Sequence, residues 1–165
     1  MSSGNSGCLY LIIRFLRKLF GLRPPLPPYQ AARFLSPAEL AFYHILRDAV
    51  GDMLTICVKV RIADVIAAPR SESYRLQFSR ISSKHFDFVL CTPQAMVPVA
   101  FVELDDSSHL TPAAQKSDAF KDATARQAGI PLFRFPVRKS LTAGEVHQAL
   151  APVLFPPKTT RSRRR

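Results

Sequence analysis

The stretches KHFDFVLC, residues 84–91, and VPVAFVELD, residues 97–105, decide the fold that we expect for this chain. In the first stretch Asp87 shares one face of a strand with a valine and a cysteine, while two phenylalanines and a leucine take the other face. The second stretch is an apolar run that ends in Glu103 and Asp105. The residues between the two stretches include a proline and have a length common in hairpin loops. We therefore predict two neighbouring antiparallel strands.

The segments before this hairpin predict a helix, a strand and an exposed connection. Residues 36–39, SPAE, combine an N-cap serine, a proline at the first helical position and a glutamate that completes a capping box. The helix is expected to end near Gly51. Residues 54–66 are rich in β-branched side chains and predict a strand that runs on into a short turn. Residues 67–80, with a proline, three serines and mixed charges, predict an exposed connection.

The segments after the hairpin predict one more strand between two helices. Residues 106–115 predict a polar loop, and residues 116–127 predict a helix closed by Gly129 and the proline that follows it. Residues 132–135 predict a short strand, and the capping box at residues 142–145 begins a last helix. A strand, a helix and a strand in succession favour a right-handed parallel crossover. The αβββαβ order, followed by a helix, predicts an α/β fold with a mixed central sheet flanked by helices on both faces.

The excess positive charge of the chain lies at its two ends. The 165 residues carry a formal net charge of +11. Residues 36–150 hold thirteen Lys and Arg against twelve Asp and Glu, whereas residues 1–35 and residues 151–165 each hold five basic residues and no acidic one. Attraction to nucleic acid or anionic lipid is therefore expected of the tails rather than of the central domain.

The three cysteines lie far apart and form no CxxC pair. They therefore predict neither a zinc site nor a disulfide framework. Cys57 and Cys91 lie within apolar runs, as buried core thiols do. A reducing cytoplasm fits this cysteine usage best.

The composition divides the chain into four parts. They are a basic amphipathic helix over residues 1–23, a Pro-rich linker over residues 24–35, a domain over residues 36–155 and a basic tail over residues 156–165. Residues 9–23 are too short and too charged to span a bilayer. Three interpretations stay open: this helix lies on a membrane surface or binds a partner, it packs on the domain, or it is a degenerate signal or anchor. A cytoplasmic location follows, with peripheral attachment to the inner membrane as the alternative.

Three carboxylates occupy strand positions that are normally apolar. Glu103 and Asp105 are two residues apart and share a face of their strand. If the two strands pair about Ala95, Asp87 lies opposite Glu103 on the same face. Carboxylates this close repel one another, and a divalent cation that prefers oxygen ligands, Mg²⁺ or Mn²⁺, relieves the repulsion. The alternative is that the acids cap strand ends or pair with Arg and Lys.

Five blocks of sequence carry a resemblance to a known family. The blocks are SPAE at 36–39, VRIADVI at 60–66, KHFDFVLC at 84–91, FVELDDSSH at 101–109 and KDATARQAGIPLFRF at 121–135. Together they resemble the bacterial domain of unknown function 2726 family, over about residues 34–138. That family is grouped with the PD-(D/E)XK phosphodiesterases and is similar to the very-short-patch-repair endonucleases. The resemblance implies a restriction-endonuclease-like fold and a metal-dependent nuclease that acts on DNA.

The resemblance also carries roles over to the residues that match the family motif. These residues are Asp87, Glu103, Asp105 and His109, with Asp106 where the relatives have glycine. The first three are implied to be the ligands of Mg²⁺ or Mn²⁺, and the histidine is implied to lie at the same site.

The chain departs from the motif at its final lysine, because Asp105 stands at that position. That lysine normally positions the attacking water and supports the developing negative charge. Lys121 on the following helix can reach back to replace it, His109 can act as acid or base, or neither residue does so. Glu39 on the first helix is a further acid that can approach the site, as helix carboxylates do in related nucleases.

Three functions are therefore compared. The first is a metal-dependent endonuclease that cuts DNA. The second is a catalytically inactive nuclease-fold module that binds nucleic acid or a protein partner. The third is an adaptor at a membrane surface, organised by residues 9–23. The retained acids favour the first function and the missing motif lysine favours the second, whereas the arginines of residues 161–165 suit phosphates and anionic lipid equally well.

Overall fold

The computed structural model describes residues 26–105 and 111–156, together with residue 11, residues 15–17 and residues 19–21. Two compact units, Met1–Phe34 and Leu35–Arg165, are considered separately. No helix within the described part of the chain is long and apolar enough to cross a bilayer.

The predicted N-terminal helix and basic tail lie largely outside the described residues. The helical residues described in the first of these segments are Leu11, Phe15, Leu16, Arg17 and Leu19. The apolar side chains among them are exposed. The interpretations of residues 9–23 and of the tail beyond Pro156 therefore stay predictions.

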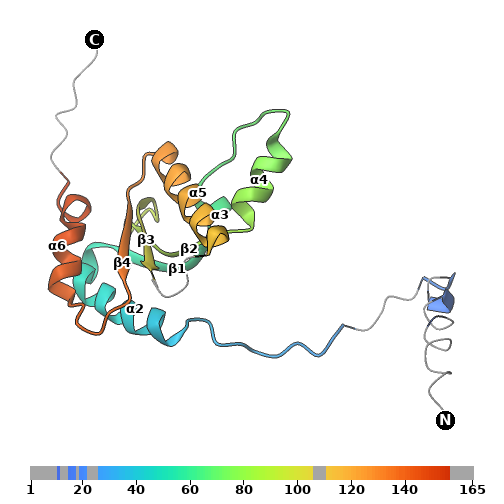
Figure 1. Ribbon diagram of the computed structural model, residues 1–165, viewed down its shortest axis with the longest axis horizontal. Coiled ribbons are helices and arrows are strands. Elements are labelled where there is room, and N and C mark those ends of the chain that lie inside the picture. Colours follow the sequence, from blue (N-terminus) through green and yellow to red (C-terminus); the bar gives the residue numbers. More distant parts are fainter. Residues whose placement is uncertain (1–10, 12–14, 18, 22–25, 106–110, 157–165) are drawn as a thin grey trace. The chain divides into compact units, whose positions relative to one another are not determined.

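The domain is built on a four-stranded sheet whose strands follow the order of the chain (Figure 1). The strands are β1 (Thr55–Arg61), β2 (His85–Cys91), β3 (Pro98–Asp105) and β4 (Leu132–Pro136). The first three strands pair antiparallel, and β4 lies parallel to β3. A parallel pair needs a long crossover, which helix α5 (Pro112–Ala128) supplies. The predicted mixed sheet is confirmed, and so is the hairpin register about Ala95, because Phe88 lies opposite Val102.

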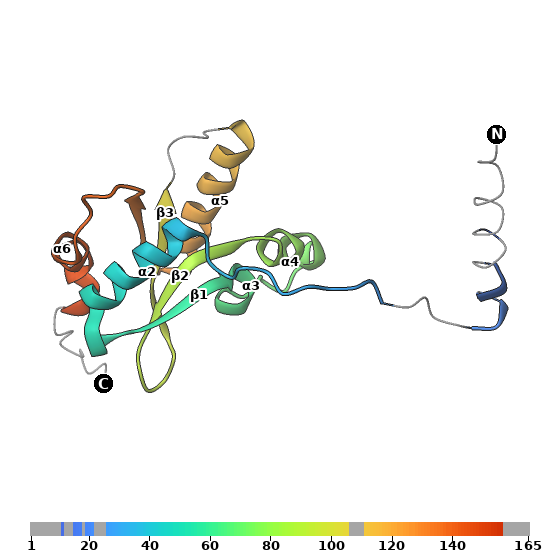
Figure 2. The same ribbon diagram turned by 90° about the horizontal axis from the view of Figure 1, so that it is seen from below.

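Helices α2 (Pro37–Val50) and α6 (Ala143–Leu154) cover one face of the sheet (Figure 2). Both begin with the predicted capping box, in which Ser36 or Thr142 exchanges hydrogen bonds with the glutamate three residues later. Alternate strand residues point toward these helices and are fully buried, namely Phe88, Leu90, Ala100 and Val102. This layer is apolar throughout.

Helices α3 (Ile62–Val65), α4 (Tyr74–Ser82) and α5 cover the opposite face. Phe86 and Phe101 stack there with ring centroids 4.0 Å apart. Gly129 ends α5 in the left-handed conformation with φ of 70°, which glycine adopts without strain. The prediction that helices flank the sheet on both sides is therefore confirmed.

The prediction of an exposed connection over residues 67–80 is wrong in its second half, because α4 begins at Tyr74. Tyr74, Phe78 and Ile81 recur at helical spacing, but no side chain caps the start of α4, so the capping signal that marks α2 and α6 is missing there. The predicted loop over residues 106–115 is also too long. Thr111 caps α5, and its hydroxyl accepts the N–H of Ala114, so the helix begins at Pro112.

Residues 54–66 form a strand that runs on into a short helical turn, as predicted. β1 ends at Arg61, and the remaining residues form the short helix α3 and its exit. The backbone N–H of Ile62 donates to the carbonyl of Lys84, and the Ile62 side chain is fully buried in the core beneath α3. β-branched residues suit a strand or a buried helical turn, so their presence alone did not locate the end of the strand.

Candidate functional site

Asp87 lies where strands β2 and β3 separate. The backbone pairing between them extends to Phe88 and Val102. At the next position the Asp87 Oδ2 atom accepts the backbone N–H of Leu104 at 3.1 Å. The Oδ1 atom lies 3.9 Å from Lys59 Nζ and 3.9 Å from His85 Nε2. The carboxylate thus takes the place of a backbone acceptor and leaves one oxygen directed at two basic groups.

Glu103 is the most buried acid of the described domain, with 6% of its side chain exposed. Its Oε2 atom accepts a hydrogen bond of 2.6 Å from Lys121 Nζ on α5. Its Oε1 atom is also buried, and no described residue donates a hydrogen bond to it. A buried oxygen without a donor is costly unless a partner is supplied.

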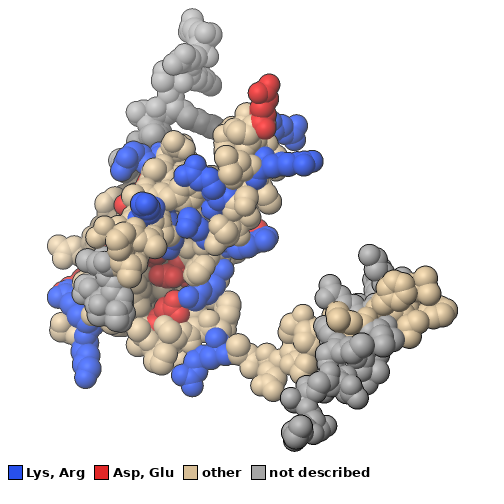
Figure 3. All heavy atoms as spheres, turned by 45° about the vertical axis from the view of Figure 1, so that its right-hand side comes forward, with Lys and Arg blue, Asp and Glu red and all other residues tan. Residues whose placement is uncertain are grey.

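Burial and the negative charge of Asp87 raise the pKa of Glu103 to about 7, although Lys121 acts in the opposite direction. Removal from water destabilises the ionised form of the carboxyl, and a second negative charge adds to that effect. We refer to Asp87, Glu103 and Lys121 as the Glu103 site. On the side of the domain seen in Figure 3, a small group of acidic side chains is surrounded by Lys and Arg side chains.

Asp105 belongs to a different group of charges. Its carboxylate accepts a 2.9 Å hydrogen bond from Arg134. Arg134 is the backbone partner of Glu103 in the parallel pairing of β3 and β4. Arg134 also lies 3.1 Å from Asp122 and 3.6 Å from Asp118, both on α5. Burial lowers the pKa of Arg134, but its hydrogen bonds to Asp122 and Asp105 and their negative charges outweigh burial and raise it. We refer to Arg134 and its three aspartates as the Arg134 cluster.

Glu39 reaches the neighbourhood of Asp87 through Lys59. One Glu39 oxygen pairs with Lys59 Nζ, and the other accepts the N–H of Ser36 in the capping box at 2.8 Å. Burial raises the pKa of Glu39, but the hydrogen bonds from Lys59 and Ser36 outweigh burial and lower it. Lys59 has a φ of 52°, which is unusual for a residue other than glycine within a strand. β1 therefore bends locally to bring this lysine between two carboxylates.

The structure brings some of the predicted site residues together and leaves others apart. Asp87, Glu103 and Lys121 meet, and Glu39 joins them through Lys59. Asp105 turns instead to Arg134, and His109 lies outside the described residues. Among the residues that are described, no three His, Cys, Asp or Glu side chains form a group that could hold a metal ion. The assignment of Asp87, Glu103 and Asp105 as joint ligands stays a prediction.

Sequence reasoning missed Lys59 and Arg134. Each is a single charged residue inside an apolar strand, in VKV at residues 58–60 and in LFRF at residues 132–135. The same signal singled out Asp87 and Glu103. Charged residues of either sign within strands were therefore the available indication, and the two basic ones turn out to be partners of the acids.

Comparison with known proteins gives one match. The model of the family described as "Protein of unknown function (DUF2726)" matches residues 31–153, which is most of the chain, so the chain belongs to this family. No curated protein matches it. No solved structure matches it either.

Proposed function

We propose that this member of the DUF2726 family is a metal-dependent nuclease of the PD-(D/E)XK type, which hydrolyses phosphodiester bonds of DNA. The observation that carries the proposal is Glu103. Its carboxylate is almost completely buried, has one oxygen without a described donor and lies beside both Asp87 and Lys121. Such an arrangement costs folding free energy, which favours a functional reason for keeping it.

The donor set of the site suits a hard divalent cation. Carboxylate oxygens are the ligands that Mg²⁺ and Mn²⁺ prefer, and Glu103 Oε1 and the Asp87 carboxylate would hold such an ion. When bound, the ion would activate a water and stabilise charge on the phosphoryl group. Asp105 would join them only after release from Arg134, which now occupies its carboxylate.

Lys121 takes the part of the lysine that the motif lacks. It comes from α5 rather than from β3, and its Nζ atom lies 2.6 Å from Glu103 Oε2. A cation at this point can orient a water and offset the negative charge that develops on a phosphate. Asp105, which stands at the motif position, is meanwhile committed to the Arg134 cluster.

One observation favours the alternative, a catalytically inactive module that binds nucleic acid or a protein partner. Three of the acids already have a cationic partner within the domain, as the pairs Glu39–Lys59, Glu103–Lys121 and Asp105–Arg134. A self-neutralised network of this kind also serves as structure alone. A cleavage assay distinguishes the two functions, whereas a binding assay does not, because a nuclease and an inactive module can both bind nucleic acid.

The test is cleavage of plasmid, linear and single-stranded DNA in the presence of Mg²⁺ or Mn²⁺. We expect Glu103→Gln and Lys121→Met each to reduce the rate by about 10²–10³-fold, as when a single positioned group that stabilises charge is removed. Glu72→Gln, the same change at an exposed acid of the α3–α4 connection, is the matched control and should cleave normally. Absence of cleavage by the native chain, together with no metal binding in calorimetry, would leave only the inactive module.

A further inference from the structure

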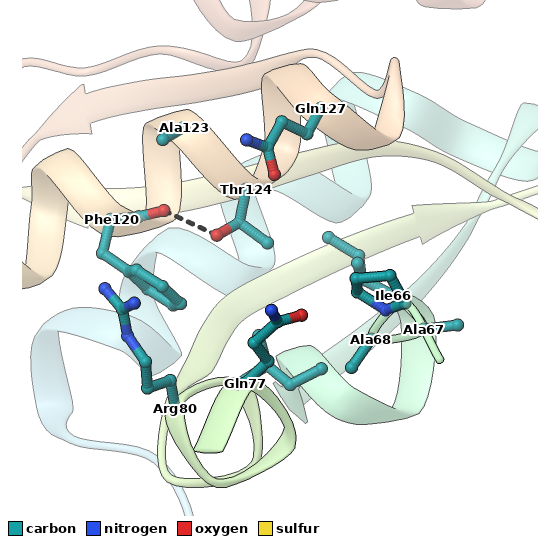
Figure 4. A pocket seen from close by; sticks show the side chains of 11 residues that line it. Ile66, Ala67, Ala68, Gln77, Arg80, Phe120, Ala123, Thr124 and Gln127 are labelled. Carbon is teal, nitrogen blue, oxygen red and sulfur yellow. Dashed lines mark hydrogen bonds between the residues drawn. The ribbon is translucent and has the colours of Figure 1, made fainter. Parts of the chain in front are cut away.

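A hollow of about 440 Å³ lies between helices α4 and α5, beside the residues that follow α3 (Figure 4). Residues 66–69 and Ile81 form an apolar wall, and the side chain of Phe120 closes another side. This volume lies within the range of pockets that hold small organic groups. The hollow is separate from the buried oxygen of Glu103, although α5 contributes to both.

The hollow combines an aromatic face with polar groups. The guanidinium of Arg80 lies 4.9 Å from the centre of the Phe120 ring, and Lys84 Nζ lies 5.9 Å from it. Gln77 extends from α4 and Gln127 from α5 toward the space between the helices (Figure 4). An aromatic ring and a guanidinium stack on flat π systems, and amides can donate and accept hydrogen bonds at the edges of a heterocycle.

The segment around the hollow is basic, although the domain as a whole is nearly neutral. Residues 66–84 contain four basic side chains, Arg70, Arg75, Arg80 and Lys84. The segment has a single acid, Glu72, which precedes α4. The three arginines are exposed. The surface beside the hollow therefore suits a polyanion.

Two exposed aromatic residues extend this surface along α4. Tyr74 and Phe78 stack with ring centroids 5.8 Å apart and an interplanar angle of 21°, and each is 41% exposed. Basic side chains interleaved with exposed aromatic rings are typical of surfaces that bind single-stranded nucleic acid, where phosphates meet the cations and bases stack on the rings.

Helix α5 connects the hollow to the Glu103 site. Phe120, which lines the hollow, directly precedes Lys121 on α5. Lys84, which directly precedes β2, donates a 3.3 Å hydrogen bond from its Nζ atom to the hydroxyl of Ser117 on α5. A strand held at the hollow would therefore bind to α5, the helix that carries Lys121 of the Glu103 site.

We propose that the hollow between α4 and α5 accepts an unpaired base of a single-stranded nucleic acid, with the phosphates of that strand on the arginines of α4 and its approach. The inference rests on the proposed function, whose substrate class it narrows to strands with unpaired bases. A duplex keeps its bases stacked inside, so it presents phosphates to the arginines but no free base to the Phe120 ring.

The test measures binding of the full chain by fluorescence anisotropy, in a chelator so that no cleavage occurs. The probes are an oligothymidylate of about 20 nucleotides, longer than common single-strand sites, the matching oligouridylate, an abasic oligomer of the same length and a blunt duplex. The abasic oligomer carries the phosphates without the bases. Contacts of the basic tails with phosphates therefore contribute equally to the two affinities, and they cancel in the ratio of oligothymidylate affinity to abasic affinity. We expect at least about fivefold tighter binding of the oligothymidylate, the lower end of the effect of one stacked base.

Three variants locate the effect. Phe120→Leu, checked for folding by circular dichroism because Phe120 is partly buried, should bring the ratio close to one while leaving the abasic affinity unchanged. Gln127→Ala, at an exposed position, should reduce the ratio severalfold. Arg80→Ala should lower the slope of log affinity against log salt by about 0.7, as expected for one phosphate contact to a single strand. Arg47→Ala on α2, which covers the opposite face of the sheet, is the matched control and should change neither quantity.

Equal binding of the abasic and base-bearing oligomers would overturn the inference, as would a duplex that binds as tightly as the single strand. A base preference that survives both Phe120→Leu and Gln127→Ala would also overturn it. Comparison of oligothymidylate with oligouridylate tells which type of strand is preferred, and either preference supports the inference. A base preference without cleavage would refute the nuclease alone, and cleavage without a base preference would refute the hollow alone.

Discussion

The Glu103 site and the Arg134 cluster share strand β3 and helix α5, and they treat charge within the domain in opposite ways. In the Arg134 cluster one cation is surrounded by three carboxylates whose side chains are 40–45% exposed, so they stay accessible to solvent. In the Glu103 site one carboxylate is almost fully buried with one lysine and a second acid nearby. The first arrangement stabilises the contact between α5 and β4. The second costs folding free energy, because one oxygen of a buried carboxylate has no described donor.

The largest change in stability is expected from a substitution that removes the cation of the Arg134 cluster. Arg134→Met leaves Asp105, Asp118 and Asp122 close together without their shared cation. We expect the free energy of unfolding to fall by about 2–3 kcal/mol, less than for a fully buried pair, because these carboxylates are 40–45% exposed. Urea unfolding followed by circular dichroism measures the change. Arg138→Met is the matched control, because Arg138 pairs only with the exposed Glu145, and its effect should stay below about 1 kcal/mol. Equal effects of the two substitutions would show that the cluster is not a structural centre.

The next effect concerns Glu103 and has the opposite sign. The folded-state pKa of about 7 lies above the ordinary value of 4.5, so the folded state holds the proton more tightly than the unfolded state. Ionisation of Glu103 therefore costs stability progressively as the pH rises from 4.5 to 7, and the full cost remains above pH 7. Below pH 4.5 both states are protonated and the cost vanishes.

Glu103→Gln should remove this penalty. In metal-free buffer the variant should gain stability over the native chain as the pH is raised, by about 2 kcal/mol near neutral pH and by little in acid. Urea unfolding of both proteins across this pH range provides the comparison. A difference that is constant with pH would mean that Glu103 does not titrate in this range.

The smallest change in stability is expected when the Arg134 cluster loses one of its three carboxylates. Asp122→Asn removes one of three carboxylates, and Arg134 keeps Asp105 and Asp118 as partners. We expect a loss below about 1 kcal/mol in the same urea assay, because the remaining partners satisfy a partly exposed cation. A loss as large as that of Arg134→Met would mean that the cluster depends on one pair rather than on shared charge.

The central hairpin could be predicted from the sequence because its pattern allows only one register. A shift by one residue would turn Phe88 and Val102 away from α2 and α6, and Asp87 into the core. Capping residues likewise located the starts of α2 and α6. Helix α4 could not be found in the same way, because no side-chain capping hydrogen bond marks its start and most of its apolar side chains are exposed.

The acids of the candidate site were also visible in the sequence, but their partners were not. Asp87 and Glu103 interrupt apolar strands, and the pleat placed them near one another. That Asp105 turns to Arg134 depends on where the parallel partner strand docks, and that Lys59 lies near Asp87 depends on a local backbone turn with a positive φ. Neither a long-range docking nor a single unusual backbone angle leaves a periodic signal.

The parallel pairing of β3 and β4 has a consequence for the order in which the domain assembles. Only the β2–β3 hairpin closes a short loop, whereas β1 pairs with β2 across residues 62–84 and β4 pairs with β3 across residues 106–131. Contacts across long loops tend to form late, because the entropy of closure must be met before they contribute. Arg134 therefore meets Asp105 after the hairpin has formed, and loss of that pair should act mainly by accelerating unfolding. The ion pair between Arg134 and Asp105 would then limit the unfolding rate, and so determine the lifetime of the native state.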